Sequence, residues 1–467
     1  MKQTTLPEWY EDLRRRLSDM AEKLPSQVQP WQGPDRVLRP EDMGYQGGMA
    51  TESIQAAMDR LSREGGGTLR LSHGDYVTGT LVMRSRVCLQ VDRGCRLLGS
   101  LDLKDYPEHI CRRVTVQDTH MGMNQALIFA EDCENIAICG PGEICGRGTQ
   151  ENFPGDETQH GTPGRPFLIR LVDCRNVHVH DLKLRDAACW MENYFNCDHV
   201  LLENLTVRNQ VNYNNDGIDI DGCRHVIVRG CDVQSGDDAL CFKGASERNT
   251  EKVLVENCRL YSSCNALKIG TDTQGDFREI LVRNCEIGGV AQDPLGIKHP
   301  YSDSGISLEM VDGGTVEEIW IHDMQIHRAW SPVFLRLEDR GRRRPDQPRP
   351  QAGTLRRVIL EDLTGEDNGP RGSYMLGIPE KPIMDVVLNR ITLRQNASLK
   401  PVTRDEDFDD MRGIYPDAHM IDDRGDAPAY ELWARYVDGL WIRSLKVETG
   451  EAEKRPARVL ERQVRTC

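Results

Sequence analysis

NVHVHDLKL, at residues 176–184, is a short apolar pattern that recurs along the chain. It returns as HVLLENLTV at 199–207, HVIVRGCDV at 225–233, KVLVENCRL at 252–260 and EILVRNCEI at 279–287. The first apolar residues of these copies are 23, 26, 27 and 27 residues apart: Val177, Val200, Val226, Val253 and Ile280. Alternating β-branched residues on either side of an Asn, Asp or Gly turn predict two short strands in each copy.

A single copy cannot bury its own apolar face, so the copies must stack on one another. Strands repeated at this spacing are typical of a right-handed parallel β-helix in which each copy forms one coil. Similar patterns begin at Asn135, Glu318, Arg357, Asp385 and Gly439. The alternative, a β-propeller, would repeat every ~40 to 50 residues with four strands in each blade. The sequence therefore predicts an all-β, single-stranded parallel β-helix.

Two segments ahead of the repeats have the apolar spacing of helices. In TESIQAAMDRLSREGGG, Ile54, Met58 and Leu61 form one stripe, and the glycines at 65–67 end the helix. We expect this helix to cap the open end of the stack. A second stripe predicts an N-terminal helical arm within residues 1–40 that packs over the body and leaves residues 41–467 to the β-helix domain. The apolar residues of that stripe are Leu6, Trp9, Leu13, Leu17 and Met20.

The chain of 467 residues has a formal net charge of -15, with 74 acidic and 59 basic residues. This balance argues against nucleic acid and anionic membrane as partners, although a locally basic pocket can still bind a small anion. No apolar run of signal-peptide length opens the sequence, and no segment reaches the ~20 apolar residues of a membrane span. We therefore expect a cytoplasmic protein, unless a leader has been removed. The oligomeric state is not predicted.

The sixteen cysteines lack CxxC pairs and the dense spacing of a small disulfide-stapled domain. Most of them precede predicted strands or lie inside them, as Cys174, Cys197 and Cys223 do. We interpret them as mainly reduced thiols that fill small buried spaces, which also favours a cytoplasmic location.

Two acidic clusters lie about one coil apart. Asp216 is in NNDGIDID at 214–221, and Asp237 and Asp238 are in SGDDAL at 235–240. Strand spacing would place Asp216 about 5 Å from the pair. Neighbouring residues of a regular strand face opposite ways, so joint use of the pair requires a bend, which Gly236 permits. Carboxylates held together cannot all ionise freely, so one can act as an acid and another as a base in cleaving a glycosidic bond.

NNDGIDID followed by SGDDAL resembles the Asn-Thr-Asp-Gly and Gly-Asp-Asp motifs of glycoside hydrolase family 28, the polygalacturonases and rhamnogalacturonan hydrolases. The likeness extends over most of the chain, through residues 65–100, GPGEICGRG at 140–148, residues 165–190 and RPARVLERQV at 455–464. It implies a pectin-lyase-like, right-handed parallel β-helix that cleaves glycosidic bonds with inversion and uses no metal or other cofactor.

The resemblance also implies roles for the acidic residues, by their positions in the family motifs. Asp237 would be the general acid. Asp216 and Asp238 would hold and deprotonate the attacking water, and Asn215 would order the groups beside it. The carboxyl groups should then be separated as in inverting enzymes, by roughly 6.5 to 9.5 Å.

Two family motifs are changed in this chain. Many polygalacturonases have Gly-His-Gly where this chain has CNA at 264–266, so the task of that histidine would fall to Asn265, to Lys268 or to no residue. Where the family usually presents Arg-Ile-Lys to a galacturonate carboxylate, this chain has Ser307 and Glu309. A glutamate there would repel a uronate, so a neutral sugar such as rhamnose fits better.

Five further residues are candidates for substrate binding. Lys268, one coil beyond the acidic pair, is placed to hold the carboxylate of a galacturonate, and Lys243 is a second candidate. His299, on a loop entering the next coil, is a candidate replacement for the family histidine, although a single loop histidine is more often structural. Trp190 and Tyr213 suit stacking on sugar rings, and Trp190 is equally suited to packing in the wall.

The sequence thus predicts a glycosidase that hydrolyses pectic oligosaccharides and releases galacturonic acid from a chain end, including ends of rhamnogalacturonan fragments. Long loops at 340–350 and 403–413 favour this exo mode, because such loops often wall a groove. Two alternatives stay open. A pectic lyase on the same fold would need bound calcium and an Arg or Lys base. A non-catalytic carbohydrate-binding solenoid would tolerate the changes at Asn265, Ser307 and Glu309.

Overall fold

The protein is represented by a computed structural model that describes residues 5–109, 111–112, 124–155, 164–246, 248–290, 300–343, 346–398, 417–418 and 426–467. The chain divides into two compact units. We call Leu24–Asp237 the N-terminal unit, and Met1–Lys23 together with Asp238–Cys467 the C-terminal unit.

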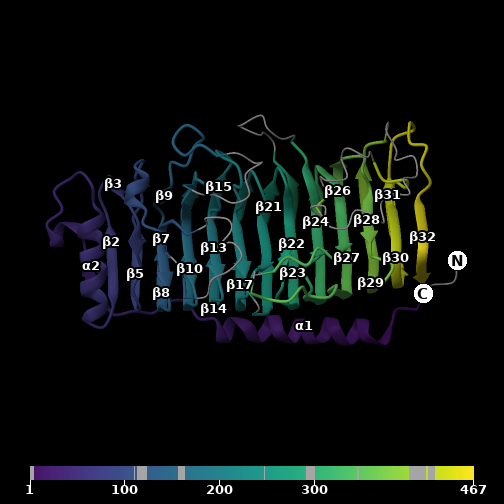
Figure 1. The fold of residues 1–467 in the computed structure, drawn as a ribbon, viewed down its shortest axis with the longest axis horizontal. Helices are drawn as coiled ribbons and strands as arrows, with labels where there is room; N and C mark the ends of the chain where they lie inside the picture. Colours follow the sequence, from purple (N-terminus) through teal and green to yellow (C-terminus); the bar gives the residue numbers. More distant parts are fainter. Residues whose placement is uncertain are drawn as a thin grey trace. The chain divides into compact units, whose positions relative to one another are not determined.

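The N-terminal unit consists of short strands arranged in successive coils (Figure 1). Two short 3₁₀ helices, Pro40–Met43 and Leu103–Asp105, interrupt its strands. The other elements are β1 (Val37–Leu38), α2 (Thr51–Arg63), β2 (Gly67–Leu71), β3 (Asp75–Thr78), β4 (Leu81–Val82), β5 (Val87–Val91), β6 (Arg96–Gly99), β7 (Ala126–Glu131), β8 (Glu134–Cys139), β9 (Glu143–Cys145), β10 (Phe167–Val172), β11 (Arg175–His180), β12 (Lys183–Arg185), β13 (Glu192–Phe195), β14 (Asp198–Glu203), β15 (Thr206–Asn209), β16 (Ile218–Asp221), β17 (Arg224–Arg229) and β18 (Asp232–Ser235).

The repeat predicted from the sequence sets the register of this unit. Val177 of β11 is paired in parallel with Val200 of β14, which is paired with Val226 of β17. Each of these coils also contains a third strand, because β10, β13 and β16 pair with one another in the same way. The repeat in the sequence did not predict this third strand, because its residues differ from coil to coil. The stacked parallel coils confirm the predicted β-helix.

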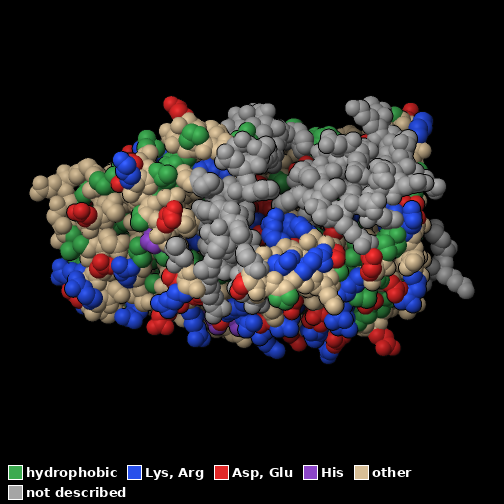
Figure 2. Space-filling model, in the orientation of Figure 1, with side chains coloured by type: hydrophobic (Ala, Val, Ile, Leu, Met, Phe, Trp, Pro, Cys, Tyr) green, Lys and Arg blue, Asp and Glu red, His purple; other side chains and the backbone are tan. Residues whose placement is uncertain are grey.

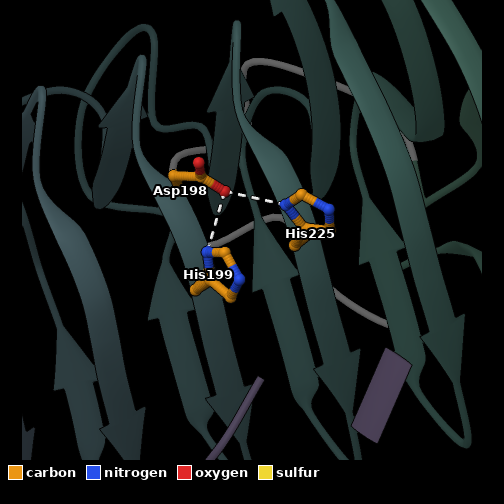
Figure 3. A group of neighbouring side chains, drawn as sticks. All are labelled: Asp198, His199 and His225. Atoms are coloured by element: carbon orange, nitrogen blue, oxygen red, sulfur yellow. Dashed lines mark hydrogen bonds and ion pairs between the residues drawn. The ribbon is translucent and has the colours of Figure 1, made fainter. Parts of the chain in front are cut away.

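One position of the coil shows how strictly the backbone repeats. Asn176, His199 and His225, each just before the first apolar residue of a copy, have φ angles of 53°, 58° and 53°. This left-handed conformation directs equivalent side chains of neighbouring coils the same way. The rings of His199 and His225 are stacked with centroids 4.6 Å apart, and both direct Nδ1 at Oδ1 of Asp198, at 3.0 and 2.9 Å (Figure 3).

The predicted cap at the start of the stack is present. Helix α2 buries Ile54, Met58 and Leu61, the three residues of the predicted stripe, and it lies beside β2 (Figure 1). The chain leaves the helix through Gly65, whose φ of 99° suits a residue without a Cβ atom. The helix thus covers apolar surface that an end coil would otherwise expose.

The C-terminal unit continues the same architecture with longer strands, several of which cover two sides of a coil. For example, β23 pairs in parallel with both β20 and β21. The strands are β19 (Leu240–Gly244), β20 (Thr250–Glu256), β21 (Arg259–Ser262), β22 (Asn265–Thr273), β23 (Phe277–Gly289), β24 (Ser302–Met310), β25 (Thr315–His327), β26 (Ala329–Leu337), β27 (Thr354–Asn368), β28 (Ser373–Leu376), β29 (Ile383–Gln395), β30 (Leu432–Ile442), β31 (Leu445–Glu448) and β32 (Arg458–Thr466).

The apolar ladder of the C-terminal unit passes through every later copy of the sequence pattern. Val253 pairs with Ile280 and Ile280 with Ile319. The ladder then continues through Val358, Val386 and Leu440. All six side chains are buried, so this column forms the core of the stack.

The N-terminal helix α1 (Glu8–Gln27) begins in the C-terminal unit and packs against its coils. Leu13 and Leu17 of the predicted stripe are buried, and Met20 is half-buried. The hydroxyl of Tyr10 donates to Oε2 of Glu361 on β27, at 2.5 Å. The edge of the molecule along α1 mixes basic and acidic side chains (Figure 2).

The cysteines have the predicted character. All sixteen are free thiols, and fifteen of them are buried, with Cys467 exposed. Several stack from coil to coil, as where the backbone N–H of Cys197 donates to Sγ of Cys223 at 3.3 Å. Among the described residues, no helix is both long and apolar enough to cross a membrane.

Candidate active site

Both acidic motifs lie on turns that lead into strands. NNDGIDID runs into β16, and SGDDAL joins β18 to β19. Residues 236–239 form the bend that the sequence required, so Asp237 and Asp238 are not on a regular strand. Asp216 and Asp238 are buried, whereas Asp237 is half-buried. Asp216 and Asp237 belong to the N-terminal unit and Asp238 to the C-terminal unit.

In the N-terminal unit, Asn215 organises the turn that carries the first aspartate. Its buried side chain accepts hydrogen bonds from the backbone N–H groups of Val211 and Asn212, at 2.8 and 2.5 Å. Its amide nitrogen donates to the carbonyls of Ala187 and Cys189, at 3.0 and 2.9 Å.

The backbone of Asn215 also reaches the second acidic motif. Its carbonyl accepts hydrogen bonds from the N–H groups of Gly236 and Asp237, both at 3.2 Å. Asn215 therefore ties the turn of Asp216 to that of Asp237.

Arg165 is a second organising residue of this turn, and it was not identified from the sequence. Its buried guanidinium donates to the carbonyl of Tyr213 at 2.6 Å and to Oδ1 of Asn214 at 2.8 Å. Tyr213 itself is half-buried. These two hydrogen bonds hold the backbone just ahead of Asp216 in place.

In the C-terminal unit, two side chains hold the carboxylate of Asp238. Nδ2 of Asn265 donates to Oδ1 at 2.8 Å, and Nζ of Lys268 lies 3.2 Å from Oδ2. The hydroxyl of Ser304 donates to Oδ1 of Asn265 at 2.6 Å, which turns the amide N–H groups toward the acids. Both residues named as substitutes for the family histidine thus contact Asp238.

Lys268 has further acidic neighbours. Its ammonium lies 2.7 Å from Oδ2 of Asp417 and 3.9 Å from Oε2 of Glu309. Lys268 is only 2% exposed, so these partners surround it inside the protein. Because the amine is engaged in this way, we assign it to Asp238 rather than to the galacturonate carboxylate considered from the sequence. Asp417, which follows β29, was not identified from the sequence.

Glu309 was expected to carry a negative charge, but its surroundings favour the uncharged form. It is fully buried, and its Oε1 accepts a hydrogen bond from the hydroxyl of Ser307 at 2.5 Å. Burial raises the pKa of Glu309 to about 8, although the nearby Lys268 ammonium acts in the opposite direction. The residue is therefore mostly uncharged at neutral pH, and the expected charge repulsion of a uronate does not arise from it.

The remaining candidates are placed as follows. Lys243 is buried in β19. The ring of Trp190 is buried and packs edge-on against Phe167, with centroids 5.5 Å apart, which supports its role in the wall. His299 lies outside the described residues.

One group of side chains in the N-terminal unit has the composition of a metal site. Ligand atoms of Asp198, His199 and His225 all lie within 4.8 Å of one another (Figure 3). However, Arg175 and Arg224 are the register neighbours of Asp198, and their positive charges oppose cation binding. We assign no ion to this group.

Comparison with known sequences gives one family. The family model described as Glycosyl hydrolases family 28 matches residues 85–401. A probable polygalacturonase of Vitis vinifera is 24% identical over 365 residues, which cover 75% of this chain and 72% of that protein. An exo-poly-alpha-D-galacturonosidase of Dickeya chrysanthemi is 22% identical over 246 residues, which cover 43% of this chain and 40% of that protein.

Solved structures show the same fold. The exopolygalacturonase of Thermotoga maritima has a TM-score of 0.67 at 21% identity, over 82% of this chain and 92% of that one. The family 28 exopolygalacturonase of Yersinia enterocolitica has a TM-score of 0.64 at 17% identity, over 90% of this chain and 79% of that one.

The aspartates on the turns before the strands supply the carboxyl groups that a glycosidase needs. The chain belongs to glycosyl hydrolases family 28. It is therefore a glycosidase that hydrolyses the O-glycosidic bonds of galacturonans.

Proposed function

We propose that this enzyme removes galacturonic acid from the ends of pectic oligosaccharides, including rhamnogalacturonan fragments, with inversion at the anomeric carbon. The observation that carries the proposal is the fixed carboxylate of Asp238. Asn265 holds one of its oxygens and Lys268 the other, and all three side chains are buried. A carboxylate oriented in this way is suited to activate a water molecule.

The proposed reaction is a single displacement. Asp237 donates its proton to the glycosidic oxygen as the bond from that oxygen to the anomeric carbon breaks. Asp216 and Asp238 hold a water molecule and accept its proton as its oxygen bonds to the anomeric carbon from the opposite face. The leaving sugar keeps the proton of Asp237 as a hydroxyl hydrogen, and the new hemiacetal has the inverted configuration.

Action at a chain end is supported by the segment that contains Asp417 and Ala418. Asp417 contacts Lys268, while Ala418 packs in a buried cluster with the aromatic rings of Phe334, Tyr374 and Trp433. Two residues of the connection that follows β29 therefore lie beside the partners of Asp238, where they limit the space for a substrate. The Dickeya relative is named as an exo-acting enzyme.

A neutral sugar beside the cleaved galacturonate is supported by Ser307 and Glu309. These residues replace the cationic side chains that the family usually has, and the raised pKa of Glu309 favours its uncharged form at neutral pH. Both side chains are fully buried and supply no cation to a substrate, and without a cation a neutral sugar such as rhamnose fits better than a second uronate.

The experiment is digestion of homogalacturonan and rhamnogalacturonan oligomers in EDTA, with products identified by mass spectrometry. We expect saturated monogalacturonate as the first product. Asp237→Asn should lower kcat by about 10²- to 10⁴-fold, whereas Asp323→Asn, which removes an exposed carboxylate from β25, should match the parent.

Other products would identify the alternatives. Unsaturated sugars that disappear when EDTA is added would indicate a calcium-dependent lyase. Internal fragments would indicate endo action, and release of rhamnose would overturn the assignment of the cleaved sugar. Equal turnover by the parent and Asp237→Asn would remove Asp237 from the mechanism.

A further inference from the structure

One ammonium group and one amide group serve two buried carboxylates. Lys268 lies 2.7 Å from Oδ2 of Asp417 and 3.2 Å from Oδ2 of Asp238. Nδ2 of Asn265 donates to Oδ2 of Asp417 at 2.9 Å and to Oδ1 of Asp238 at 2.8 Å. Both of these donors to Asp238 are therefore also held by Asp417.

The amide of Asn265 has little freedom to serve Asp238 in another way. Its oxygen accepts the hydroxyl hydrogen of Ser304 at 2.6 Å, so its two N–H groups must face the aspartates. Asp417 and Asp238 are the two oxygen acceptors, at 2.9 and 2.8 Å, and Sγ of Cys264 is a weaker third acceptor at 3.3 Å. Loss of the Asp417 acceptor would release one side of this bridge.

Lys268 has an alternative partner within reach. Oε2 of Glu309 lies 3.9 Å from its ammonium, is buried and has no hydrogen-bond partner among the described residues. A lysine ammonium can turn toward any nearby acceptor because its three N–H groups rotate freely. The short contact with Asp417 keeps the ammonium on the Asp238 side.

We propose that Asp417 is a positioning residue for hydrolysis, acting through Lys268 and Asn265 to hold the carboxylate of Asp238 in its orientation. This inference rests on the proposed function, in which Asp238 helps to activate water. Asp417 lies in the chain between β29 and β30.

The test compares Asp417→Asn with the parent on an oligogalacturonide substrate. The variant keeps the size of the side chain and an acceptor oxygen but loses the charge. We expect kcat to fall by about 10- to 100-fold, as when a reacting group is misplaced by about 1 Å. KM should change less than threefold, because Asp417 does not bind the sugar in this proposal.

The pH profile separates positioning from general damage. Removing a negative charge beside ionisable groups eases their ionisation, so both limbs of the kcat profile should move to lower pH. Asp417→Glu restores the charge and should recover part of kcat and the parent pH profile. Asp426→Asn is the matched control, because Asp426 is in the same connection and accepts a hydrogen bond from Ser398 instead.

The outcomes distinguish this inference from the proposed function. An inactive parent, or a fully active Asp238→Asn variant, would contradict the proposed function. An active parent, an inactive Asp238→Asn and an Asp417→Asn variant with unchanged kcat and pH profile would contradict the role of Asp417 alone. A fall in kcat that Asp426→Asn reproduces, or a rise in KM alone, would also contradict it. If Asp417→Asn does not fold, the same measurements on Asp417→Glu decide: a parent-like kcat and pH profile would contradict the inference.

Discussion

Replacement of Lys268 by methionine tests whether its positive charge stabilises the buried carboxylates of Asp238 and Asp417. The side chain of Lys268 is 2% exposed, and those of Asp238 and Asp417 are 4% and 1% exposed, so none of the three charges is well solvated. Lys268→Met preserves most of the side-chain volume but leaves both carboxylates without their shared cation. Removing one partner from a buried ion pair typically costs about 3–5 kcal/mol of folding free energy.

The measurement is urea-induced unfolding of the parent and the variant at pH 7, followed by intrinsic fluorescence and circular dichroism. Coinciding transitions would permit free energies of unfolding to be compared directly. We expect Lys268→Met to lower this free energy by about 3–5 kcal/mol. Lys446→Met, which removes a lysine paired with Glu448 on the surface, should have little effect.

A second substitution tests the cause of the loss. Lys268→Met combined with Asp417→Asn removes one carboxylate together with the cation, so the double variant should be more stable than Lys268→Met alone. The two substitutions should therefore be strongly non-additive, as expected for groups in one network. A free energy of unfolding for Lys268→Met within about 1 kcal/mol of the parent would show that Lys268 does not stabilise the two carboxylates. Strict additivity of the two substitutions would show the same.

Two further predictions concern buried polar groups that have no role in the proposed reaction. Burial raises the pKa of Glu192 from its ordinary 4.5 to about 8, so the folded protein keeps a proton that the unfolded chain has lost. Between these pH values, Glu192 lowers the free energy of unfolding by up to about 1.4 kcal/mol per pH unit. Glu192→Gln should therefore gain stability relative to the parent as pH rises from 5 to 8 in urea titrations, and a constant difference would contradict this. Tyr10→Phe removes the hydrogen bond from α1 to Glu361 and should cost about 0.5–1.5 kcal/mol in the same assay, whereas no change would show that the contact adds nothing.

The sequence predicted the features of this fold that depend on repetition. Val177, Val200 and Val226 were expected to stack because each copy alternates apolar residues at a similar spacing, and they are register partners. The bend at Gly236 was expected because Asp237 and Asp238 cannot act together on a regular strand. Local pattern and local geometry were sufficient for these features.

Features that depend on distant contacts could not be predicted in this way. Asp417 is 149 residues from Lys268 along the chain, and nothing in the spacing of either residue indicates that they meet. The uncharged form of Glu309 follows from its complete burial, which the motif GISLEM does not reveal. The position of Glu309 was identified from the sequence, but its burial was not.

The most direct test of the account is the configuration of the first product. Digestion of an α-linked oligogalacturonide can be followed by proton NMR from the first minutes, before the product mutarotates. We predict that β-galacturonic acid appears first and that its α anomer grows only later. Initial release of the α anomer would contradict the proposed displacement by water at Asp216 and Asp238, and an unsaturated product would contradict hydrolysis itself.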